Sequence, residues 1–146
     1  MLKIDNNEHY ITPSYLTDSL GDFVDAIIRL KPEFVDADEV KGYSCFEWDC
    51  EPAIYKWFLY NEPDNKVRIK ILVYADEFQA SAKETINGIC DFDNLVSKIV
   101  SGYIQLKEYI TKRRNIEVKV FNQDEWNEYY HSSFDEELSL LKKALN

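Results

Sequence analysis

The fold of this chain rests on residues 43–74, which read YSCFEWDCEPAIYKWFLYNEPDNKVRIKILVY. This stretch contains two of the three tryptophans and the densest run of β-forming residues. In its middle, Glu62-Pro63-Asp64-Asn65 places proline at the second position of a turn, where its fixed φ suits a type I turn. We therefore predict a β-hairpin with Tyr60 opposite Val67 and Phe58 opposite Ile69.

This register has consequences for both faces of the hairpin. One face becomes apolar except for Lys56, because Ile54, Phe58 and Tyr60 then lie beside the apolar residues of the second strand. The other face places Trp57 next to Lys70 and Arg68, where a cation–π contact is expected. Tyr43, Tyr55, Trp57 and Tyr74 are expected to share this second face.

The residues before the hairpin predict another strand at 43–49. Alternation places Phe46 and Trp48 on one face and Glu47 and Asp49 on the other, and Glu51-Pro52 interrupts the ladder because proline lacks the N–H donor. A further strand is predicted at 85–91, with a bulge near Gly88.

Helical periodicity appears on both sides of these strands. A first helix is predicted from Thr12-Pro13 to Lys31-Pro32, with an acidic outer stripe at Asp18, Asp22 and Asp25. Apolar residues predict a second helix over 92–110, and alternation predicts a short strand over 116–121. A short closing helix would carry Leu138, Leu141 and Leu145.

Together these elements predict an α+β single domain spanning residues 1–146. Strands joined by tight turns favour an antiparallel sheet of about four to five strands, with the two long helices packed on one face and a short C-terminal helix. At 146 residues the chain is long enough to bury a core without disulfides or metal.

The charge of the chain limits its partners. A net charge of −10 argues against nucleic acid, because phosphate binding requires a basic surface. Residues 33–51 hold seven acids and one base, a concentration that would steer a basic protein partner toward the chain. No apolar run follows Met1, so neither a signal peptide nor a membrane segment is predicted, and a cytoplasmic location is expected.

The motifs of common enzymes are missing from the sequence. The three cysteines, Cys45, Cys50 and Cys90, lack the paired spacing of a zinc site, and no phosphate-binding or nucleophile motif is present. We therefore expect no metal, no cofactor and no enzymatic activity. The alternative is a small hydrolase: Glu47, Asp49 and Glu51 alternate along one strand face at about 6.5–7 Å, which suits a pair of catalytic carboxylates.

The leading interpretation is a protein-binding module with an acidic surface. Its candidate partner-binding residues are Asp18, Asp22, Asp25, Glu47, Asp49, Glu51 and Trp57. A homodimer that pairs through the aromatic face of the sheet is a further alternative.

Two segments, YLTDSLGD at 15–22 and FEWDCEP at 46–52, resemble an uncharacterised family of short bacterial α+β proteins. The hairpin residues, Gly88 and the 92–110 helix extend this resemblance over most of the chain. The resemblance implies a bacterial cytosolic protein and no particular reaction. More loosely, the size and acidity of the chain are similar to those of immunity proteins that neutralise secreted toxins.

Overall fold

The computed structural model of the chain describes residues 2–4, 7–11, 19–75, 81–117 and 138–143. They form an α+β structure in which a four-stranded antiparallel sheet is the largest element. The chain divides into two compact units, Met1–Phe92 and Asp93–Asn146. Whether these units make one domain, as the sequence predicts, stays a prediction.

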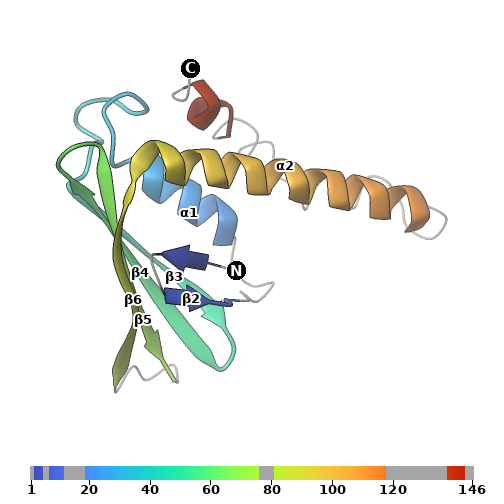
Figure 1. The fold of residues 1–146 in the computed structure, drawn as a ribbon, viewed down its shortest axis with the longest axis horizontal. Coiled ribbons are helices and arrows are strands. Elements are labelled where there is room, and N and C mark those ends of the chain that lie inside the picture. Colours follow the sequence, from blue (N-terminus) through green and yellow to red (C-terminus); the bar gives the residue numbers. More distant parts are fainter. Residues whose placement is uncertain (1, 5–6, 12–18, 76–80, 118–137, 144–146) are drawn as a thin grey trace. The chain divides into compact units, whose positions relative to one another are not determined.

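The main sheet is built in chain order from four strands (Figure 1): β3 (Tyr43–Cys50), β4 (Ala53–Glu62), β5 (Lys66–Tyr74) and β6 (Ala82–Asp91). Short turns force this order for the first three strands, because antiparallel strands need only a tight turn to pair. Glu51 and Pro52 alone separate β3 from β4, so Cys50 lies opposite Ala53. The predicted interruption of the strand at Pro52 is therefore a hairpin turn.

The predicted register of the β4–β5 hairpin is wrong by one residue. Tyr60 lies opposite Arg68 rather than Val67, and Leu59 lies opposite Ile69. The loop has three residues instead of four, because Asp64 and Asn65 both adopt left-handed backbone conformations, with φ of 59° and 55°. A shift of one residue changes the face on which every β4 side chain lies relative to β5.

The observed register places the buried apolar side chains of the sheet on one face, which we call the inner face. Its large buried apolar residues are Trp57, Leu59, Val67, Ile69, Ile71 and Ile86. Helix α1 (Ser19–Ile28) lies against β3, and its Phe23 ring contacts Phe46, Trp48 and Trp57 at centroid distances of 6.1 Å or less. Phe46 and Trp48 thus share a face opposite to Glu47 and Asp49, as alternation predicts.

The opposite side, the outer face, has no buried side chain among the described residues of the four strands. It carries Tyr43, Cys45, Glu47, Lys56, Phe58, Tyr60, Arg68, Lys70, Tyr74 and Ile89. The four aromatic residues expected on one face are therefore divided, since Tyr55 and Trp57 lie on the inner face and Tyr43 and Tyr74 on the outer face.

Strand β6 contains a bulge, but not at the predicted position. The register shifts between Ile71 and Leu72, so Thr85 is the extra residue, and its hydroxyl donates to the carbonyl oxygen of Ile71 at 3.3 Å. Gly88 pairs regularly with Ile69. The bulge returns Glu84 to the outer face, within reach of Lys70.

The helices agree in part with the sequence. The apolar stripe of α1 is confirmed, since Phe23, Val24 and Ile27 are buried. The helix ends at Ile28, before its predicted end at Lys31-Pro32, and its predicted start at Thr12-Pro13 lies outside the described residues. Helix α2 spans Phe92–Glu117, so residues 116 and 117 are helical and not a strand, because α2 continues past its predicted end. The rest of that predicted strand lies outside the described residues.

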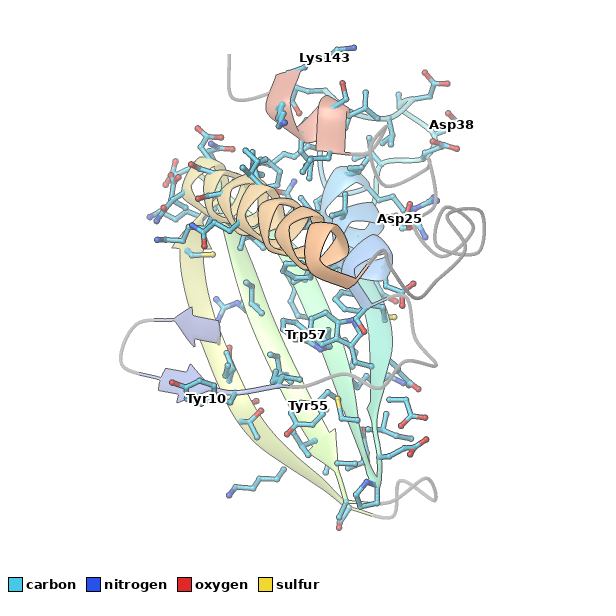
Figure 2. The ribbon with its side chains drawn as sticks, turned by 90° about the vertical axis from the view of Figure 1, so that its right-hand side faces the viewer. Tyr10, Asp25, Asp38, Tyr55, Trp57 and Lys143 are labelled. Atoms are coloured by element: carbon cyan, nitrogen blue, oxygen red, sulfur yellow. The ribbon has the colours of Figure 1, made fainter. Side chains whose placement is uncertain are left out.

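The two ends of the chain add smaller elements. Strands β1 (Leu2–Ile4) and β2 (Asn7–His9) form a separate hairpin, and β1 contacts β6 (Figure 2). Residues 138–143 are helical, with Leu138 and Leu141 buried, as predicted for the closing helix. The packing of both long helices on one face of the sheet stays a prediction.

The β4–β5 turn offers a first test. Asn65→Val is expected to lower the free energy of unfolding by about 1–2 kcal/mol, because a β-branched side chain is strained in the left-handed region. Asp64→Gly should raise stability by up to about 1 kcal/mol, since glycine accepts positive φ without strain. Urea denaturation measures both changes. Asn87→Val, on extended β6, is the control and should change stability by less than about 0.5 kcal/mol.

Candidate functional site

The predicted partner-binding residues do not form one surface patch. Asp22 and Asp25 lie on α1, which packs on the inner-face side of β3, whereas Glu47 and Asp49 lie on the outer face. Asp18 lies outside the described residues. Because these groups point to different sides of the sheet, a single partner surface cannot use all of them.

The two acids of α1 are already engaged within the chain. Asp25 accepts a hydrogen bond from Arg29 Nε at 2.8 Å, one helical turn away. This hydrogen bond raises the pKa of Arg29, and the charge of Glu39 adds a smaller upward contribution. Asp22 also has interactions within the chain. The helix therefore presents an ion pair rather than a stripe of free carboxylates.

The acidic row on β3 is also partly engaged. Lys56 Nζ donates to Glu47 Oε1 at 2.7 Å across the β3–β4 ladder, and this hydrogen bond raises the pKa of Lys56. Asp49 Oδ1 accepts the backbone N–H of Glu51 at 3.0 Å, which helps to shape the turn into β4. Glu51 itself is exposed in that turn. The row therefore contributes to the local structure of the hairpin.

Trp57 cannot belong to a surface in this fold. Its side chain is 2% exposed and lies on the inner face, opposite Phe46 and Ile71 (Figure 2). The predicted cation–π contact with Lys70 or Arg68 is wrong for the same reason, because those residues lie on the outer face. On that face Lys70 pairs with Glu84 at 3.2 Å, and Arg68 pairs with Glu62 at 2.7 Å.

A third acidic element of the structure, besides α1 and β3, is the loop formed by residues 33–42. All four of its acids are exposed, and Lys41 is its only base. The acids are Glu33, Asp36, Asp38 and Glu39. The loop is held at both ends, since Phe34 N–H donates to the Lys31 carbonyl and Lys41 N–H donates to the Arg29 carbonyl at 2.7 Å. We call this segment the acidic loop.

The sequence contained a signal for the acidic loop. Its acids contribute four of the seven between residues 33 and 51, but they stand in a stretch without periodicity. The expectation of a basic partner included the whole acidic segment 33–51, but the individual residues predicted to bind it followed strand and helix patterns and did not include these four acids. Exposure on an irregular connection is what distinguishes them from the paired acids of α1 and β3.

Three further findings bear on the kind of site. Within the described residues, no group of three or more His, Cys, Asp or Glu side chains could hold a metal ion. None of the described helices is both long and apolar enough to pass through a membrane. Comparison with protein-family models, curated proteins and solved structures finds no match to the chain. The resemblance to a bacterial family therefore stays a prediction.

The cysteines allow a test of the two faces of β3. Burial, followed by the nearby charge of Asp49, raises the pKa of the Cys50 thiol, whereas Cys45 is exposed on the outer face. Because the thiolate is the reactive form, Cys45 is expected to react with a maleimide several-fold faster than Cys50 at pH 8. Mass spectrometry after brief labelling measures the ratio.

Unfolding the protein provides the control for this measurement. In denaturant the burial of Cys50 is lost, so the two rates should become similar. Faster labelling of Cys50 than of Cys45 in the folded protein would contradict the assigned faces.

Proposed function

We propose that this chain is a non-enzymatic protein-binding module, similar in use to an immunity protein, that meets a basic protein through its acidic loop. The observation that carries the proposal is the exposure of all four acids of this loop, together with a chain charge of −10. A cytoplasmic location and a bacterial origin belong to the same proposal and depend on the sequence alone.

Complementary charge mainly accelerates association and sets salt dependence. Four carboxylates on one exposed loop raise the local concentration of a cationic partner, and a field of this kind changes association rates by about 10-fold or more. Screening shortens its range from about 10 Å at 0.1 M salt to about 3 Å at 1 M. Binding should therefore be strong at low salt and weak at high salt.

The test compares two variants with equal charge changes. In the first, Glu33→Gln, Asp36→Asn, Asp38→Asn and Glu39→Gln neutralise the acidic loop. In the second, Glu47→Gln, Asp49→Asn, Glu51→Gln and Glu84→Gln neutralise four acids on β3, the β3–β4 turn and β6. Each protein is immobilised and exposed to a bacterial extract at low salt. The proteins that salt elutes are then identified by mass spectrometry, and association rates are measured for the purified ones.

The wild-type protein and the second variant should retain the same basic proteins, whereas the first variant should lose about 10-fold or more in association rate. If the wild type retains no basic protein at low salt, the proposal fails. Equal loss in both variants would show that net charge alone, and not the acidic loop, attracts the partner.

The hydrolase alternative has less support from the geometry. Glu47 is held by Lys56, and Asp49 accepts a backbone N–H from Glu51, so each carboxylate has a structural partner.

The homodimer alternative has one observation in its favour, the exposure of Tyr43 at 56% and Ile89 at 39% on the outer face. Light scattering at several protein concentrations measures the oligomeric state directly.

A further inference from the structure

The outer face carries a row of stacked aromatic rings. Tyr43 lies opposite Tyr60, with ring centroids 6.0 Å apart and planes at 28°. Tyr60 in turn stacks with Phe58 at 6.4 Å and 12°. Tyr43 ends this row and is 56% exposed. An aromatic side chain that is held in place by its neighbours and still reaches solvent is typical of protein recognition sites.

The row ends beside the acidic loop. Gly42 is the last residue of the loop and its carbonyl accepts the N–H of Asn61, so the ladder between β3 and β4 continues directly into the loop. The β4–β5 turn, with exposed Asp64, lies at the same end of the sheet (Figure 1). The exposed ring of Tyr43 therefore lies at the end of the sheet where acidic side chains are concentrated.

Three cations of the outer face have ion-pair partners of their own. Arg68, Lys56 and Lys70 are paired with Glu62, Glu47 and Glu84. The cation–π contact found among the described residues joins Lys31 Nζ to the Phe92 ring, at 4.7 Å from the ring centroid, and does not involve Tyr43. The Tyr43 ring, at 56% exposure, is therefore accessible to a cation from outside the chain.

We propose that Tyr43 is the docking point for an arginine side chain of the basic protein partner, an inference that rests on the proposed function. A guanidinium group is planar and weakly hydrated, so it stacks on a tyrosine ring better than an ammonium group and can also reach nearby carboxylates. The acidic loop attracts the partner, and the Tyr43 ring selects arginine over lysine. Nucleic acid bases also stack on tyrosine, but the acidic loop repels their phosphates.

The experiment uses the whole protein and two fluorescent peptides of equal length and charge, one of arginine and glycine and the other of lysine and glycine. Fluorescence anisotropy measures the affinity of each peptide for the wild type, Tyr43→Leu and Tyr43→Phe. Tyr74→Leu is the matched control, because Tyr74 lies on the same face at the far end of β5. Circular dichroism verifies that each variant is folded.

We expect the wild type to bind the arginine peptide more tightly than the lysine peptide. Tyr43→Leu should weaken arginine-peptide binding by about 2- to 5-fold and remove this preference, whereas Tyr43→Phe and Tyr74→Leu should retain it. An unchanged preference in Tyr43→Leu, or no preference in the wild type, overturns the inference. So does Tyr43-dependent binding of a single-stranded oligonucleotide, or a dimer that Tyr43→Leu dissociates.

Failure of this inference can be separated from failure of the proposed function. If basic proteins are retained through the acidic loop but Tyr43→Leu changes nothing, the proposed function stands and the arginine contact is wrong. If the acidic loop retains no basic protein, both are wrong.

Discussion

Trp57→Ala is expected to lower the free energy of unfolding by about 3–5 kcal/mol, because it removes the largest fully buried side chain of the inner face. The Trp57 ring is surrounded by other rings, with centroids 5.4 Å from Phe23, 5.6 Å from Phe46 and 4.5 Å from Trp48. The loss is a large part of the about 5–15 kcal/mol that stabilises an ordinary protein. Urea denaturation, followed by circular dichroism, measures it.

Two other variants sharpen this prediction. Trp57 Nε1 is buried and has no hydrogen-bond acceptor among the described residues, so Trp57→Phe removes a polar group that is costly to bury. Trp57→Phe should therefore cost much less than Trp57→Ala. Tyr43→Ala is the control for an exposed aromatic residue and should cost about 1 kcal/mol or less. A small effect of Trp57→Ala would show that Trp57 is not at the centre of the core.

The parts of the fold that the sequence predicted well are those in which burial and periodicity agree. Phe23, Val24, Ile27 and Leu30 recur at helical spacing, and a helix that packs one face needs this pattern. In the same way, Phe46 and Trp48 alternate with acids on β3. In both cases the spacing of the apolar side chains allows only one face of the element to be buried, so the sequence predicts that face without ambiguity.

The β4–β5 register could not be predicted by the same reasoning. Both faces of β4 contain large apolar residues, since Phe58 and Tyr60 alternate with Trp57 and Leu59. Periodicity therefore allowed two registers, and loop length had to choose between them. Asp64 and Asn65 tolerate left-handed conformations, which permits the shorter loop, but Pro63 also fits the longer one.

The acids that are free to bind a partner could not be predicted for a related reason. Sequence shows which residues are acidic but not which of them have a cation opposite. Glu47 meets Lys56 because the two residues face each other across the ladder, and this follows only from the observed pairing of β3 with β4. The acidic loop has no ladder to supply such a partner, and all four of its acids are exposed.

A matched pair of substitutions on neighbouring residues tests the observed register. Ile69→Asp is expected to lower the free energy of unfolding by several kcal/mol or to prevent folding, because Ile69 is fully buried between Leu59 and Gly88. Lys70→Asp introduces the same side chain one residue later, on the outer face. It removes an ion pair with Glu84 and places two acids together, which should cost about 1 kcal/mol or less.

A double-mutant cycle between Leu59 and Ile69 makes the test independent of whether Ile69→Asp folds. Leu59→Ala and Ile69→Val each remove part of a buried cross-strand pair, so their effects should be non-additive by about 0.5 kcal/mol or more. The four-residue loop instead pairs Ile69 with Phe58 and places Leu59 on the opposite face. Non-additivity between Phe58 and Ile69, with additivity between Leu59 and Ile69, would show that the hairpin in solution uses that longer loop.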